Sequence, residues 1–298
     1  MTVILNDTFG SINKSIWTNI YSSTGWLPNG TPGSTYNPAN VTADSSGLHL
    51  AIKKESYNGY SYTGGGLGGL ASQYQISQGR WEAKAKFPSC GSEKGVVGFI
   101  LLMATGSDIP EIDFAETTGS DANTIILTQH SSSGTKTDTA SGIDTTQWHT
   151  YTVDVWNNQV KFYIDGILKS TQTQNFTSQK LTVSMGTWTG KCSGYGGCPT
   201  NTSFPQSLDI AYVKIDNDAS TPIGTSSSSS TTTTNTNSGS TTSNTGSTTN
   251  TNSGSTTSNT GSTSLSSITS SITSFFNNLS SEEKLLIGVI ILIIILRR

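Results

Sequence analysis

The sequence changes character at about Pro222, and this change limits where a folded core can form. Before it, aliphatic and aromatic residues recur in short runs; after it, the chain is almost entirely Ser, Thr, Asn and Gly as far as Ser264. The fifteen residues Thr234–Thr248 are repeated unchanged at Thr249–Thr263. Such a segment has too few apolar side chains to fold. We therefore expect one folded domain over residues 1–218 and a disordered stalk over residues 219–264.

The pattern of the first 218 residues is typical of an all-β domain. Leu48–Ile52 and Thr150–Val155 are alternating or β-branched runs, which favour strands, and turn residues separate such runs. The segment Val155–Ile167 contains the pairs NN and DG at two successive turn positions. Both pairs are frequent in two-residue hairpin turns, so this segment predicts three consecutive antiparallel strands.

The charges and cysteines exclude some classes of protein. The formal net charge is −3, and no block of Lys or Arg precedes the last two residues, so we expect no nucleic-acid partner.

No Cys and His spacing suits zinc, and we expect no metal site. Cys192 and Cys198 are candidates for a disulfide in an oxidising compartment, which leaves Cys90 unpaired. Three reduced thiols without a role are the alternative.

Apolar residues return in the C-terminal tail. Residues 265–281 carry them at helical spacing, which predicts an amphipathic segment, and residues 282–298 contain the apolar run Leu285–Leu296 followed by two arginines. We predict a C-terminal membrane helix that serves as an anchor, with a buried core helix as the alternative. Twelve residues rise about 18 Å, whereas the hydrocarbon core is roughly 30 Å thick, so a span requires snorkelling by the flanking basic residues.

The two ends of the chain give conflicting indications about location. If the tail spans a membrane, its terminal arginines favour the cytoplasmic side and leave the β-domain outside. The stretch Met1–Phe9 has the pattern of a first strand and lacks the features of a secretory signal peptide. We therefore expect an external, membrane-anchored domain at a cell surface or virion envelope, exported by a route that needs no such signal.

Three acidic residues lie in one predicted strand: Glu111, Asp113 and Glu116, in the segment PEIDFAE. Because side chains alternate along a strand, Glu111 and Asp113 share a face and Glu116 points to the other. A single β-bulge restores Glu116 to the common face. Three neighbouring carboxyl groups repel one another, which raises the pKa of at least one and supplies the general acid that glycoside hydrolysis requires. The alternative is a set of acids on the wet face of a half-exposed strand.

The segment EIDFAE resembles the E-x-D-x-x-E signature of glycoside hydrolase family sixteen, in its bulged, laminarinase-like form. Further similar segments follow the family order: GRWEAKAKFP (79–88), LTQH (127–130), WHTYTVDVWNNQVKFYIDG (148–166), MGTWTG (185–190) and SFPQSLDIAYVKID (203–216). The resemblance covers nearly all of residues 1–218. It implies a jelly-roll β-sandwich with a concave substrate cleft, with Glu111 as nucleophile, Glu116 as general acid/base and Asp113 between them.

Three further residues are candidates for substrate binding. His130 matches a histidine that the family places beside the acid/base, and we expect it to bond Glu116 or a sugar hydroxyl. Trp188 and Trp26 are expected to stack on sugars, because the apolar face of a pyranose packs on aromatic rings. A structural histidine and tryptophans in the core or at the rim are the alternatives.

The sequence departs from the family in the strand before the acids. Relatives usually carry W-P-A-F-W there, whereas residues 95–102 are GVVGFILL, so the sugar-stacking rings are absent and a related polymer can replace laminarin. The segment GGGLGG, residues 64–69, is expected to form a loop, either closing over the cleft or simply connecting strands. No cofactor is required. Structural calcium occurs in many relatives, but no ligand set for it can be assigned from this sequence.

The leading hypothesis is an endo-acting, retaining hydrolase of β-1,3 or mixed-linkage β-glucan, or of a related surface polysaccharide, tethered to a membrane. A transglycosylase that uses the same covalent intermediate is a close variant. The alternatives from other classes are a non-catalytic carbohydrate-binding adhesin and a structural virion or surface protein on the same fold. Three mutually repelling acids favour the enzyme, since a protein that only binds has no need of them.

Overall fold

The computed structural model describes residues 2–23, 33–89, 95–117, 121–190, 196–199, 203–221 and 223. The chain separates into two units, residues 1–230 and 231–298, and every described residue belongs to the first. The predicted amphipathic segment and anchor, and almost all of the stalk, lie outside the described residues. Within the described ranges, no helix is long and apolar enough to cross a membrane.

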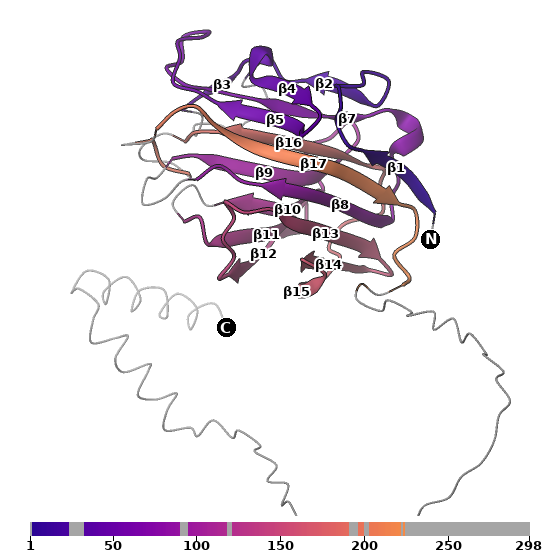
Figure 1. The fold of residues 1–298 in the computed structure, drawn as a ribbon. Helices are drawn as coiled ribbons and strands as arrows, with labels where there is room; N and C mark the ends of the chain where they lie inside the picture. Colours follow the sequence, from indigo (N-terminus) through magenta and orange to yellow (C-terminus); the bar gives the residue numbers. More distant parts are fainter. Residues whose placement is uncertain are drawn as a thin grey trace, which may run out of the picture. The chain divides into compact units, whose positions relative to one another are not determined.

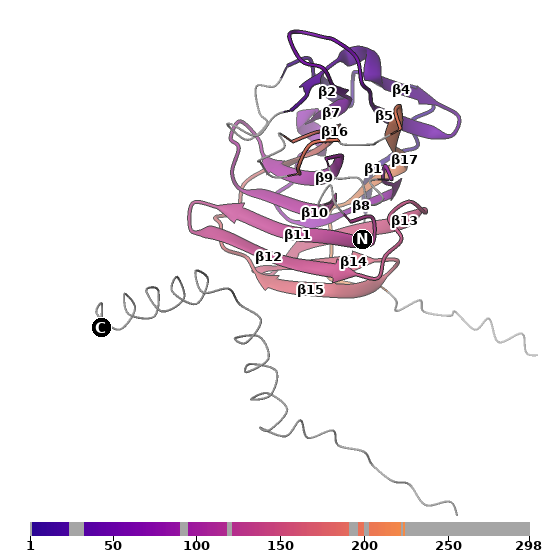
Figure 2. The same ribbon diagram turned by 90° about the vertical axis from the view of Figure 1, so that its left-hand side faces the viewer.

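Two antiparallel sheets packed face to face make up the first unit, which confirms the predicted all-β jelly-roll sandwich (Figures 1 and 2). The eight-stranded sheet has the order β15-β14-β13-β8-β17-β5-β4, with β1 paired to β17. Its strands are β1 (Val3–Asp7), β4 (Val41–Asp44), β5 (Gly47–Ile52), β8 (Gly79–Lys86), β13 (His149–Trp156), β14 (Gln159–Ile164), β15 (Ile167–Thr173) and β17 (Gln206–Asp216).

The seven-stranded sheet has the order β12-β11-β10-β9-β16-β7-β2. Its strands are β2 (Trp17–Ile20), β7 (Gly66–Leu70), β9 (Val97–Ala104), β10 (Glu111–Thr117), β11 (Thr124–Ser131), β12 (Gly134–Ser141) and β16 (Leu181–Trp188). A short parallel pair, β3 (Thr35–Tyr36) and β6 (Thr63–Gly64), and two short 3₁₀ helices, Pro38–Asn40 and Ser72–Tyr74, complete the described elements.

The predicted succession of three antiparallel strands is confirmed by β13, β14 and β15. Asn157 and Asn158 have φ angles of 49° and 62°, and Asp165 and Gly166 have φ angles of 51° and 74°. Asn, Asp and Gly tolerate this left-handed region better than other residues. Two-residue turns with both φ angles positive match the twist of the strands that they join, which explains why the local sequence was sufficient here.

The main hydrophobic core lies between the two sheets, and a second apolar cluster covers the opposite face of the seven-stranded sheet. Strand β9 contributes to both: Ile100 and Leu102 belong to the core, whereas Phe99 and Leu101 belong to the second cluster. The alternation of side chains in β9 explains this division. The other buried members of the second cluster are Tyr21, Tyr36, Val97 and Trp188.

The expectation that residues 64–69 form a loop is wrong. Gly64 ends β6, and Gly66–Leu70 form β7, which pairs with β2 and β16. A Cβ atom on Gly66 or Gly68 would overlap the ring of Tyr21, which lies against the backbone of β7. These glycines therefore provide room for an aromatic ring, a requirement that a glycine-rich sequence does not distinguish from loop flexibility.

Cys198 is disulfide-bonded. Cys90 and Cys192 both lie outside the described residues, so the pairing of Cys192 with Cys198 stays a prediction.

Candidate active site

The acidic strand β10 lies inside the seven-stranded sheet, between β9 and β11, and contains the predicted β-bulge. Its register against β9 shifts between Asp113 and Ala115, and its register against β11 shifts between Asp113 and Glu116. As a result, the consecutive residues Phe114 and Ala115 both belong to the core between the sheets. The bulge therefore returns Glu116 to the face that carries Glu111 and Asp113.

Cross-strand pairing fixes the neighbours of each acid on this face, because directly opposed residues project to the same side of a sheet. Glu111 lies opposite Met103 on β9 and opposite His130 on β11. In the same way, Asp113 lies opposite Leu101 and Thr128, and Glu116 lies opposite Phe99 and Ile126. The structure thus brings four of the predicted site residues, the three acids and His130, onto one face.

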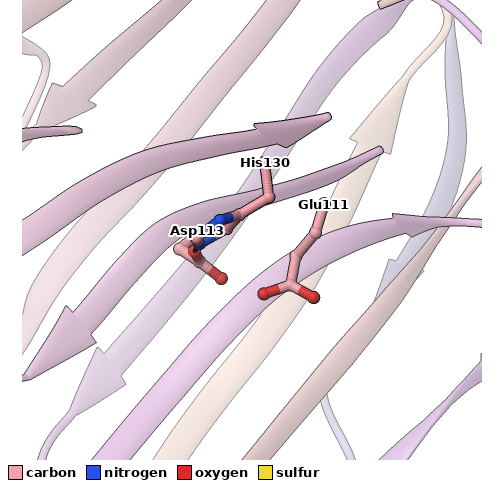
Figure 3. A group of neighbouring side chains, drawn as sticks. All are labelled: Glu111, Asp113 and His130. Carbon is pink, nitrogen blue, oxygen red and sulfur yellow. Dashed lines mark ion pairs between the residues drawn. The ribbon is translucent and has the colours of Figure 1, made fainter. Parts of the chain in front are cut away.

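Asp113 is buried, with 3% of its surface exposed, and it contacts His130. The Nε2 atom of His130 lies 3.3 Å from Oδ2 of Asp113, and the carboxyl group of Glu111 lies beside this pair (Figure 3). The Nδ1 atom of His130 lies 3.1 Å from Oγ1 of Thr135 on β12. The hydrogen bond to Asp113 raises the pKa of His130, although partial burial opposes this effect.

The pKa of Glu111 is raised from 4.5 to about 9. Burial is the largest cause, followed by the charge of Asp113, a hydrogen bond with Asp113, and the charges of Glu116 and Asp108. The surroundings of Glu111 therefore favour the protonated form of its carboxyl group, which can form a hydrogen bond with Asp113. Burial raises the pKa of Tyr21 to about 12. The hydrogen bond with Ser184 lowers this pKa, and the charge of Glu111 raises it by a smaller amount.

Glu111, Asp113 and His130 also have the residue types of a metal site, and their ligand atoms lie within 4.8 Å of one another. A divalent cation requires deprotonated carboxylates and a neutral imidazole. The raised pKa of Glu111 and the ion pair between Asp113 and His130 disfavour both conditions.

Of the two tryptophans predicted to bind sugar, only Trp188 lies within the described residues. It ends β16 opposite Val97, on the same sheet face as the acids, and is 3% exposed within the second apolar cluster. Its ring therefore packs inside this cluster in the present conformation, and its stacking role stays a prediction, as does that of Trp26.

Two residues near the acids escaped the sequence analysis. Tyr21 follows β2, and its hydroxyl group lies 2.7 Å from Oγ of Ser184 on β16. Asp108 lies in the turn between β9 and β10 and contributes to the raised pKa of Glu111. Neither residue belongs to a motif. The short spacing between Asp108 and Glu111 was the one available signal for an additional negative charge at the site.

Comparison with known proteins places this geometry in context. The family profile described as "Glycosyl hydrolases family 16" matches residues 31–214. The endo-1,3-1,4-beta-glycanases ExsH and EglC of Rhizobium meliloti (strain 1021) are each 34% identical to this chain, over 148 and 151 residues. These matches cover 46% and 47% of this chain but only 31% and 32% of the relatives, so the chain spans about a third of the curated relatives that it matches.

Solved structures with the same fold include the laminarinase catalytic domain from Thermotoga maritima MSB8, with a TM-score of 0.63 at 20% identity over 73% of this chain and 98% of that chain. The endo-beta-1,3-glucanase from Pyrococcus furiosus has a TM-score of 0.62 at 21% identity, over 72% of this chain and 93% of that chain. At these identities the similarity shows a shared fold.

Proposed function

Because the chain belongs to family 16 of the glycosyl hydrolases, we propose that residues 1–218 form an endo-acting, retaining glycosidase that cleaves β-1,3 or mixed-linkage β-glucan, or a related surface polysaccharide. The observation that carries this proposal is the bulge in β10, which gathers the carboxyl groups of Glu111, Asp113 and Glu116 on one sheet face. The names of the relatives, which refer to 1,3 and 1,3-1,4 linkages, support the choice of substrate.

In the proposed mechanism, Glu111 attacks the anomeric carbon and Glu116 donates a proton to the leaving glycosidic oxygen. This step forms a covalent glycosyl-enzyme, and a water molecule deprotonated by Glu116 then releases the sugar with net retention. Glu111 must lose its proton before it attacks. Asp113 is the proposed acceptor because it already shares a hydrogen bond with Glu111, and the ion pair with His130 holds Asp113 in place.

The test measures new reducing ends when the purified full chain acts on a panel of β-glucans. Wild type is compared with Glu111→Gln and Glu116→Gln. A matched control is Glu82→Gln. Glu82 lies on β8 of the eight-stranded sheet, between the core residues Trp81 and Ala83, so its side chain points away from the core and from the sheet that carries the acids. We expect wild type and control to release oligosaccharides and each acid variant to lose activity by roughly a thousandfold or more.

A substrate with an activated aryl leaving group distinguishes the two acids. Such a leaving group departs without being protonated. We therefore expect this substrate to restore formation of the glycosyl-enzyme in Glu116→Gln but not in Glu111→Gln. Binding of a glucan by wild type without cleavage would contradict the enzyme and favour an adhesin.

We further propose that the C-terminal residues 265–298 tether this domain to a membrane, with the domain on the outer side. The amphipathic segment, the apolar run and the terminal arginines of the sequence support this proposal.

A further inference from the structure

A groove of about 450 Å³ runs along the seven-stranded sheet beside the acid cluster. Its lining includes Asn19, Tyr21, Gly69, Met103, Asp108 and Thr182, which come from the β2, β7, β9 and β16 region and from the turn between β9 and β10. Met103 lies directly opposite Glu111 in the pairing of β9 with β10. The groove therefore lies next to the strand that carries the proposed nucleophile.

The floor of the groove is fixed and uncharged. The Tyr21 ring lies against Gly66 and Gly68, and its hydroxyl group is held by Ser184 at 2.7 Å. Asn19, another lining residue, is exposed and presents an amide that can both donate and accept hydrogen bonds. A fixed aromatic ring with neutral hydrogen-bonding groups suits the hydroxyl groups of a sugar.

The wall of the groove carries a negative charge. Asp108 is exposed in the turn before β10, and no salt bridge to it is found among the described residues. Its charge reaches Glu111, since it is one of the causes of the raised pKa there. Within the described part of the chain, no Lys or Arg lines the groove, and the nearby His130 is paired with Asp113.

We infer that this groove is a subsite for uncharged sugar residues, and that Asp108 makes it reject sugars that bear carboxylate, sulfate or phosphate groups. The inference rests on the proposed function and specifies its substrate class. An anionic substituent in the groove would meet the charge of Asp108, and no Lys or Arg among the described lining residues would compensate it. Like charges in proximity produce specificity by repulsion.

The test uses the purified full chain in the Glu111→Gln background, so that ligand is not consumed. Affinities are measured by calorimetry for a β-1,3-gluco-oligosaccharide and for its carboxymethylated form, before and after Asp108→Asn. We expect the Glu111→Gln protein to bind the neutral ligand better. We also expect Asp108→Asn to raise the ratio of anionic to neutral affinity about threefold to tenfold at low ionic strength, and less at about 0.5 M salt because screening weakens the repulsion.

The matched control Glu82→Gln removes the same charge from the outward face of the eight-stranded sheet, and we expect it to leave the ratio unchanged. Equal affinity for the two ligands, no binding of either, or a ratio that Asp108→Asn does not change would overturn the inference. A different outcome is that Asp108→Asn changes the affinity ratio as expected but the wild-type protein releases no reducing ends. That outcome would contradict the proposed hydrolase and leave the inference about the groove intact.

Discussion

At the scale of single residues, the chemistry of this protein depends on the environment of Glu111. The pKa of a glutamate with no such neighbours is about 4.5. Burial and the neighbouring Asp113, Glu116 and Asp108 raise the pKa of Glu111 to about 9. Folding therefore favours the protonated form of this side chain. The ionised form that nucleophilic attack requires costs free energy in the unliganded protein.

This cost predicts a pH-dependent effect of Glu111→Gln on stability. Between pH 4.5 and about 9 the unfolded chain releases the Glu111 proton while the folded protein retains it. Wild-type stability therefore falls as pH rises through this window, whereas glutamine does not titrate. We expect Glu111→Gln to stabilise the protein at pH 8, by an amount on the order of 2 kcal/mol, and to have little effect near pH 4.

Thermal unfolding of the two proteins from pH 4 to pH 9 checks this prediction, with a difference of several degrees expected at the alkaline end. The same difference at both ends of the range would show that titration of Glu111 is not the cause.

At the scale of secondary-structure elements, two irregular features shape the site. The β-bulge in β10 turns Glu116 toward the other acids, and the glycines of β7 leave room for Tyr21. The bulge was predictable because the spacing of the acids conflicts with strict alternation. The role of the β7 glycines was not, since it depends on a ring that arrives from β2.

The packing of Tyr21 on β7 predicts that Gly68→Ala is destabilising. A Cβ at this position would meet the Tyr21 hydroxyl group, so the ring must move and its bond to Ser184 is lost. Overpacking of this kind costs about 1–3 kcal/mol. Gly10→Ala is the matched control, because no atom lies within 4 Å of its Cβ position. Chemical denaturation measures both variants, and equal midpoints would contradict the described packing.

At the scale of the whole molecule, the β-sandwich precedes a C-terminal tail that we propose to be a membrane tether. We expect the full chain to sediment with lipid vesicles and a chain lacking residues 265–298 to remain in the supernatant, because the apolar run supplies the binding free energy. Vesicle sedimentation with quantified pellet fractions is the measurement. If glucan cleavage is retained in the shortened chain, the tail acts only as a tether. Equal pellet fractions for the two chains would contradict the proposed anchor.

The sequence by itself determined the features that follow from local rules. The turns at Asn157-Asn158 and Asp165-Gly166 follow from residues that tolerate positive φ, and the common face of Glu111, Asp113 and Glu116 follows from strand alternation plus one bulge. Both depend only on residues that are neighbours in the chain.

The tertiary structure alone decided which distant residues meet these acids. The contact of His130 with Asp113, the burial of Trp188 and the packing of the Tyr21 ring on β7 all depend on which strands become neighbours in the seven-stranded sheet. The physical reason is that cross-strand register and burial join residues far apart in sequence, and burial, which depends on this packing, is the largest cause of the raised pKa of Glu111.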